Sequence, residues 1–222
     1  MTENLFLISA IISILSLDIT IAFQVLISSP IFSCTILGWL LGDIRLGIEL
    51  GFIFQLLWLG KIPAGAYIVP EGNIASMIAV VLVLLNRENG WENTTLVVVF
   101  LEAILVSYLG SLLTLYYRKF NGKILNLMVQ EVEKIHINIL LLLELSSMIS
   151  YFLAVFLLAY LVLRISSLSL PALIPVIGKL FENQFAVAKP VIVGIGLASI
   201  YPILKEVFTK LPGKKLETNR YI

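Results

Sequence analysis

A few polar side chains stand inside otherwise apolar segments of this 222-residue sequence, and they are the first candidates for chemistry. Gln55 lies in the run Phe-Gln-Leu-Leu-Trp-Leu-Gly. Its amide can both donate and accept hydrogen bonds, which suits a neutral polyhydroxy ligand. The same amide could instead form a hydrogen bond between two helices. Position alone favours neither interpretation, so both stay open.

Ionisable residues inside the apolar segments form a second group of candidates, because a charge at membrane depth is costly and usually faces a cavity or a partner. Asp43 and Arg45 follow Gly42, so an ion pair or a helix-end cap competes with contact to a solute. Glu49 lies six residues before Gln55, which at about 100° per residue puts the two on different faces of a helix. We do not expect Glu49 and Gln55 to act together.

The residues that carry most enzyme chemistry are scarce. His136 is the single histidine, and no nucleophile or second titrating partner lies near it, which favours a structural role over catalysis. Cys34 is the single cysteine and has no companion for a disulfide, a zinc site or an iron-sulfur site. The motifs GxxxxGK[ST], HExxH and GxSxG do not occur. The sequence therefore predicts no catalytic residues, no metal ligands and no cofactor.

The composition indicates whether this chain is surrounded by water or by lipid. Apolar residues make up 59% of it, the mean hydropathy is +1.03, and 13% of residues are charged, against about 25% in soluble domains. Fifteen basic and fourteen acidic residues leave a net charge of +1, far from the excess that nucleic-acid binding requires. The sequence thus predicts a lipid-embedded protein and excludes nucleic acid as its partner.

Apolar segments of two lengths alternate with breaks. Four reach the roughly 20 residues that a bilayer core requires, namely Leu5–Ile27, Thr95–Tyr117, Ile137–Leu163 and Val187–Phe208. Pro30–Leu41 and Ile74–Leu85 are about half as long and are bounded by Gly42-Asp43 and by the run from Pro70 to Asn73. Segment 44–60 between them would make a tilted or slightly short span. Such short pieces are typical of re-entrant or broken helices beside a polar cavity.

We therefore predict an all-α, polytopic membrane protein with spanning helices and, in its N-terminal half, re-entrant or broken helices. One membrane domain is expected over residues 1–210, followed by a cytoplasmic tail over 211–222. Interrupted hydrophobic segments indicate a transport site, because half-helix ends and free backbone groups can contact a substrate. Residues 30–77 are the candidate transport region.

Basic residues indicate which side of the membrane each connection occupies. They gather in two places, Arg118, Lys119, Lys123 and Lys134 in one and Lys205, Lys210, Lys214, Lys215 and Arg220 in the other. The positive-inside rule places both in the cytoplasm, and with them the C-terminus. The loop 86–94 is then external, and the connection 165–186 lies outside or returns into the membrane. The side of the N-terminus depends on how many of the short segments cross.

One ordered series of residues and motifs carries a family resemblance. The series is Ser29-Pro30, Leu37-Gly38, Leu41-Gly42-Asp43, Gly47, Gly51, the run from Gln55 to Gly60, Gly65-Ala66, Pro70-Glu71 and Ile74-Ala75-Ser76. It resembles the IIC subunit of the mannose/fructose/sorbose family of the bacterial phosphotransferase system. Weaker likeness continues through Gly110 to Thr114, Arg118, Ile135-His136 and Val193 to Gly196. Family members commonly continue beyond the segment 187–208, so the resemblance indicates a divergent, shortened member.

The resemblance implies a sugar permease subunit in the bacterial cell membrane. Such a subunit carries a hexose or related sugar across the membrane, pairs with a IID membrane subunit and assembles as a trimer of IIC–IID pairs. Cytoplasmic IIA and IIB proteins supply the phosphate, so phosphoryl transfer is expected on those partners. This agrees with the lack of a catalytic constellation in the sequence.

The resemblance also implies where the sugar binds. The family's sugar contacts match Gln55 and Glu71 of this chain, where the family commonly has Glu and Asp. We expect Asn73 to bind sugar hydroxyls beside them, Asp43 to belong to the turn that shapes the site, and Gln24 to lie in the same site. The predicted sugar-binding set is therefore Gln24, Asp43, Gln55, Glu71 and Asn73.

Two other functions compete with this one. The lost acid at Gln55 and the short C-terminus suit a non-transporting descendant that acts as a membrane scaffold or regulator. An ion-coupled secondary carrier using Asp18, Glu102 or Glu144 is the third possibility. It ranks last because these acids are scattered along the chain, and for Glu102 and Glu144 a hydrogen bond across a helix or subunit interface is favoured.

Overall fold

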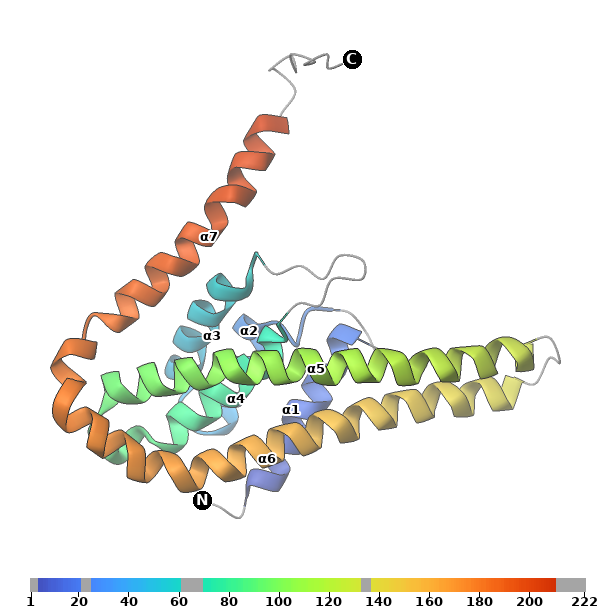
Figure 1. Ribbon diagram of the computed structural model, residues 1–222, viewed down its shortest axis with the longest axis horizontal. Helices are drawn as coiled ribbons and strands as arrows, with labels where there is room; N and C mark the ends of the chain where they lie inside the picture. Colours follow the sequence, from blue (N-terminus) through green and yellow to red (C-terminus); the bar gives the residue numbers. More distant parts are fainter. Residues whose placement is uncertain (1–3, 21–24, 61–69, 133–136, 211–222) are drawn as a thin grey trace.

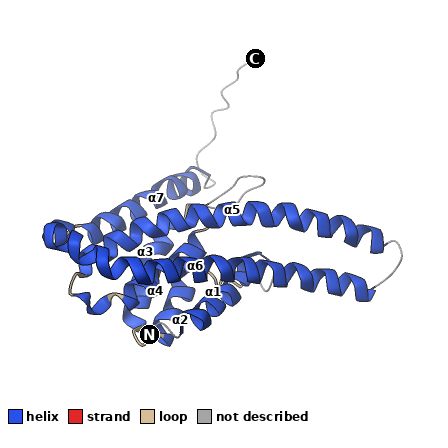
Figure 2. Cartoon of the chain, turned by 60° about the horizontal axis from the view of Figure 1, so that its bottom comes forward, coloured by secondary structure: helices blue, strands red, loops and turns tan. Residues whose placement is uncertain are grey.

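The computed structural model describes residues 4–20, 25–60, 70–132 and 137–210. Every regular element within these residues is helical, which confirms the predicted all-α class (Figures 1 and 2). The elements are α1 (Leu5–Thr20), α2 (Pro30–Leu40), α3 (Ile44–Trp58), α4 (Gly72–Leu85), the 3-10 helix η2 (Arg87–Asn89), α5 (Glu92–Val132), α6 (Ile137–Phe185) and α7 (Ala188–Lys210).

α2 and α3 form a short antiparallel hairpin whose turn is fixed by residue type. Pro30 stands in the first turn of α2, where a missing N–H has no consequence. Gly42 has a φ of +89°, the left-handed conformation in which glycine commonly ends a helix. The carboxylate of Asp43 then accepts a hydrogen bond of 3.0 Å from the amide of Leu46 and caps α3. The helix break predicted at Gly42-Asp43 is confirmed.

Glycine lets the backbones of α2 and α3 touch. A Cβ on Gly47 would lie 2.6 Å from the carbonyl oxygen of Cys34 and 2.9 Å from the Cα of Gly38. Gly47 and Gly51 have the GxxxG spacing that permits close helix contact in membranes. At 1.5 Å per residue the two helices are about 17 and 23 Å long, shorter than the roughly 30 Å of a bilayer core.

α4 lies at the centre of the molecule. Ten of its 14 residues are buried, and it packs against α1, α2, α3, α5 and α6. Its apolar side chains surround the whole helix, which is typical of a helix enclosed by protein. The predicted segment Ile74–Leu85 is confirmed as a short helix that begins two residues earlier, at Gly72.

α5 and α6 form the long hairpin that dominates both views (Figures 1 and 2). The predicted connection after Tyr117 is wrong, because α5 continues as a helix to Val132. The reason is packing against α6, where the Asn121 side chain accepts a 2.7 Å hydrogen bond from Ser147. At 41 residues α5 is about 62 Å long, twice the thickness of a bilayer core.

The predicted connection 165–186 is also helical, since α6 continues through it to Phe185. Its buried residues keep the four-residue spacing of one helix face, with Ser166, Leu170, Ile174 and Gly178 all turned inward. Pro171 and Pro175 interrupt the hydrogen bonds of this part without ending the helix. The ribbon changes direction in this orange part of α6 (Figure 1), as prolines commonly cause.

The first helix is shorter than predicted. The segment Leu5–Ile27 was expected to be one span, but residues 25–27 are not helical and α1 ends at Thr20. The buried carboxylate of Asp18 accepts hydrogen bonds from the amides of Val25 at 2.9 Å and Ser28 at 3.2 Å. These bonds hold the chain in a turn before α2.

The outer surface fits a lipid environment. Among the described residues, α5 over Glu92–Asn126 and α6 over its whole length are long and apolar enough to cross a membrane. Large apolar side chains point outward along both, including Leu105 and Leu142, which are two-thirds exposed. Such a surface on a soluble protein would be a large unpartnered patch. α7 packs against α3 and agrees closely with the predicted segment 187–208.

Candidate functional site

The end of α3 and the start of α4 meet, and three of the predicted sugar-binding residues, Gln55, Glu71 and Asn73, belong to these two helix ends. Gln55 is one turn before Trp58 on α3, and the Trp58 indole lies directly on Gly72, where an added Cβ would meet the ring at 2.3 Å. Glu71 and Asn73 flank Gly72. We call Gln55, Trp58, Glu71 and Asn73 the junction site.

Glu71 is fixed against the middle of α5. Its amide donates a 2.9 Å hydrogen bond to the carbonyl oxygen of Ser107. Its side-chain Oε1 accepts a 2.7 Å hydrogen bond from the Thr114 hydroxyl. Gly110, between these two residues on α5, leaves the space that the Glu71 side chain occupies. These two hydrogen bonds hold Glu71 in one place, and neither of them uses the second carboxylate oxygen, Oε2.

Several polar atoms of the junction site have unused hydrogen-bonding capacity within the described part of the chain. The buried Nε1 of Trp58 has no acceptor. Gln55 Oε1 accepts a long bond of 3.4 Å from the Ile31 amide, which is the helix–helix contact anticipated for it. Its two amide hydrogens remain available. Donors and acceptors at one junction can together bind a ligand that carries several hydroxyl groups.

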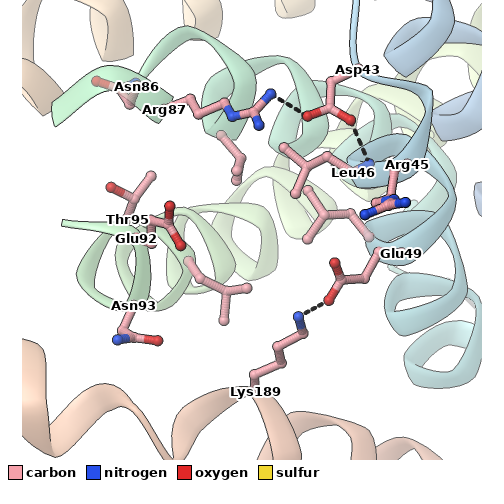
Figure 3. A pocket seen from close by; sticks show the side chains of 13 residues that line it. Asp43, Arg45, Leu46, Glu49, Asn86, Arg87, Glu92, Asn93, Thr95 and Lys189 are labelled. Carbon is pink, nitrogen blue, oxygen red and sulfur yellow. Dashed lines mark hydrogen bonds and ion pairs between the residues drawn. The ribbon is translucent and has the colours of Figure 1, made fainter. Parts of the chain in front are cut away.

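A separate charged pocket lies at the other end of α3 (Figure 3). Its volume is about 260 Å³, and its lining includes Asp43, Arg45, Glu49, Asn86, Arg87, Glu92, Asn93, Thr95 and Lys189. Two ion pairs cross it, from Asp43 to Arg87 and from Glu49 to Lys189. With Leu46 bound to Oδ1 and Arg87 to Oδ2, both Asp43 carboxylate oxygens have partners.

The structure therefore separates Asp43 from the other predicted sugar-binding residues. Gln55 is twelve residues after Asp43, the N-cap of α3, which is about 18 Å along the helix axis. One monosaccharide cannot contact both. Gln24, the fifth member of the predicted set, lies outside the described residues, as does His136.

The remaining intramembrane acids take local roles. Glu102 on α5 accepts a hydrogen bond from Ser166 on α6, which is the interhelical contact favoured from the sequence. Asp18 holds the turn before α2. Glu144 is exposed on α6. The three acids lie on different helices and do not converge, which gives the ion-coupled carrier no common site.

Glu182 is a polar contact residue that the sequence did not predict. Its carboxylate accepts four hydrogen bonds at the start of α5, from the amide and side chain of Asn93 and from the amide and hydroxyl of Thr94, at 2.6 to 3.0 Å. A carboxylate at a helix N-terminus is favourable. Because α6 was not expected to reach residue 182, no local signal connected Glu182 with Asn93.

The side chains of the junction site offer hydrogen bonds to a ligand. Within the described ranges no group of three His, Cys, Asp or Glu residues could hold a metal ion. The junction site offers amides, an indole N–H and a carboxylate beside helix ends. That set can position a neutral polar molecule at an interruption of the helices, as transporters do.

Comparison with known proteins identifies the family of this chain. Residues 3–208 match the family described as the sorbose-specific IIC component of the PTS system. The sorbose-specific EIIC component of Klebsiella pneumoniae is 30% identical over 89 residues, which is 40% of this chain and 31% of that protein. The sorbose-specific EIIC component of Lacticaseibacillus casei is 26% identical over 172 residues, or 77% of this chain and 60% of that protein.

Two solved structures share the fold. One, described only as a membrane protein, has a TM-score of 0.70, and the mannose transporter ManYZ in complex with microcin E492 has a TM-score of 0.63. Each is 20% identical and covers 96% of this chain and 87% of the matched chain. The sequence alignments span less than two thirds of the length of the relatives. With nearly its whole length matched, this chain belongs to the sorbose-specific IIC component family of the phosphotransferase system.

Proposed function

We propose that this chain is the sugar-translocating membrane subunit of a mannose-type phosphotransferase system, and that the junction site binds the sugar. The family match supports the class of activity. The observation that supports the site is the contact of Trp58, one turn after Gln55 at the end of α3, with Gly72, which Glu71 and Asn73 flank at the start of α4. Broken helices beside polar side chains are where transporters bind solutes.

Each residue of the junction site has a role in this proposal. The Gln55 amide and the Trp58 indole N–H donate hydrogen bonds to sugar hydroxyl oxygens. The Glu71 carboxylate, held by Thr114, accepts from a sugar hydroxyl with its second oxygen. Asn73 can do both. Asp43 stabilises the turn between α2 and α3 and does not touch the sugar.

The family match and the ManYZ neighbour support a proposal about the partners of this chain. We propose that a IID membrane subunit pairs with this chain, that the pairs form trimers, and that cytoplasmic IIA and IIB proteins phosphorylate the sugar. On this view the basic end of the α5–α6 hairpin and the C-terminus face the cytoplasm. A scaffold that has lost transport is the alternative, and Gln55 in place of the common acid is what favours it.

Sugar binding by the reconstituted membrane complex tests the proposal. Gln55→Leu removes the amide without adding charge, so we expect binding to fall below detection while membrane insertion stays normal. Gln184→Leu, the same change on an exposed position of α6, is the matched control and should bind as the unchanged protein does.

Two results would contradict the proposal. If Gln55→Leu bound sugar like the control, the site would lie elsewhere. If the unchanged protein, with its partners present, neither bound nor took up any hexose, hexitol or related sugar, the scaffold function would replace the transport function.

A further inference from the structure

An apolar groove runs along the outside of the α5–α6 hairpin, near its basic end. Its volume is about 610 Å³, and its walls include Leu113, Tyr116 and Phe120 from α5 and Ala154, Leu157 and Leu161 from α6. Tyr116, Phe120 and Leu157 are about half exposed or more. Ala154 has a small side chain, which leaves the groove deeper at this position than a leucine would.

Positive charge stands at one end of this groove. The ammonium of Lys119 lies 5.8 Å from the centre of the Tyr116 ring. Lys123 is one turn further along the same side of α5. Few acidic residues lie near these lysines. Residues 103–130 of α5 contain no Asp or Glu, and Glu144 is the single acid in residues 137–149 of α6.

The depth of the groove matches a membrane interface. The apolar run of α5 ends at Tyr117, and the charged residues begin immediately after it. Tyrosine rings are commonly found at the level of lipid headgroups. The groove therefore extends from headgroup depth into the hydrocarbon layer, with its cations at the headgroup end.

We propose that this groove is a binding site for an anionic phospholipid, with one acyl chain lying along the groove and the headgroup phosphate bound by Lys119 and Lys123. Charge complementarity selects an anionic headgroup, because basic residues between transmembrane helices attract such lipids. Each lysine near an anionic lipid surface contributes about a fivefold gain in affinity. This proposal does not depend on the sugar site.

The test is lipid binding by the purified full chain, measured by native mass spectrometry with phosphatidylglycerol and with phosphatidylethanolamine of the same acyl chains. We expect the unchanged protein to prefer phosphatidylglycerol. The double change Lys119→Gln and Lys123→Gln should lower phosphatidylglycerol affinity at least fivefold and phosphatidylethanolamine affinity by a smaller factor, so that the preference for phosphatidylglycerol is lost. Lys205→Gln, an exposed lysine on α7, is the control and should change neither.

A second pair of variants tests the groove itself. Ala154→Phe fills the groove and should lower the binding of both lipids, whereas Leu153→Phe, on an exposed position next to it in sequence, should not. Equal binding of the two lipids by the unchanged protein, or no effect of the double lysine change, would overturn the proposal. So would a change of oligomeric state in Ala154→Phe with normal lipid binding, because the groove would then be a protein interface.

Discussion

The short helices α2–α4 and the long helices α5–α6 are held together by different contacts. Between α2 and α3 the backbones themselves meet, because Gly38, Gly47 and Gly51 carry no side chain. Between α5 and α6 side chains make the contacts, by apolar packing and by hydrogen bonds from Ser166 to Glu102 and among Tyr117, Asn121 and Ser147. The α2–α3 contact leaves no room for a side chain at these glycines, whereas the α5–α6 contact can lose a single hydrogen bond and keep the others.

The two regions also differ in how completely their polar groups are bonded. On α5 and α6 the buried hydroxyl and carboxylate groups have hydrogen-bond partners, some across the two helices and others in the backbone of their own helix. At the junction of α3 and α4, within the part of the chain that the structure describes, the Trp58 indole N–H has no acceptor. This difference is one reason for proposing the sugar site at the ends of the short helices and a supporting role for the long ones.

The largest effect should come from the glycine contacts. Gly47→Leu places a side chain against the backbone of α2, where no rotamer relieves the clash, so we expect a loss of about 3 kcal/mol or more and little folded protein. Thermal unfolding of the purified chain measures this. Gly122→Leu on α5, with open space around it, is the control. Similar melting of both variants would show that backbone contact is not what holds α2 to α3.

Glu182→Ala should have the next largest effect. It removes four hydrogen bonds to Asn93 and Thr94 and a negative charge at the start of α5, so the free energy of unfolding should fall by about 2 kcal/mol. Glu144→Ala, on an exposed part of α6, should cost less than about 0.5 kcal/mol. Denaturant titration in detergent compares the two. Equal stabilities would mean that side-chain bonds do not join the two long helices.

Tyr117→Phe probes a single bond of the hairpin. The buried hydroxyl of Tyr117 lies 2.7 Å from that of Ser147, which still has Asn121 as an acceptor after the change. We expect a loss of about 1 kcal/mol, and none in the exposed control Tyr108→Phe. A loss as large as that of Gly47→Leu would remove the distinction between the two regions.

The smallest effect is expected from Asp43→Asn. The exposed Arg87 loses its ion-pair partner, which should cost about 0.5 kcal/mol, while an asparagine oxygen can still cap α3. Sugar affinity should stay within twofold of the unchanged protein, because Asp43 lies far from the junction site. A tenfold loss of sugar affinity would instead return Asp43 to the sugar site and remove the division between the two ends of α3.

Much of the short-helix region could be predicted from local sequence. Pro30, Gly42-Asp43 and the run from Pro70 to Asn73 are strong helix-end signals, and the structure places the ends of α2, α3 and α4 there. The conformational limits of proline and glycine act within one or two residues. Predictions from such signals therefore hold without knowledge of the tertiary structure.

The long hairpin was less predictable, because its helices depend on contacts between residues that are distant in the sequence. The basic residues after Tyr117 predicted one connection, and the positive-inside orientation of the neighbouring segments predicted another at 165–186, yet both stretches are helical. Their helix is stabilised by packing against a partner helix, including Ser147 with Asn121 and Ser166 with Glu102. Local propensity is weaker than such tertiary contacts.

The sequence by itself determined that this chain is all-helical, lies in a membrane and breaks its helices between residues 30 and 85, because hydropathy and the backbone limits of proline and glycine are local properties. Only the tertiary structure decided which polar groups share a site. It brought Trp58 onto Gly72 beside Glu71 and placed Asp43 at the far end of α3. Which side chains meet depends on how helices pack, and packing is decided by contacts between residues distant in the sequence.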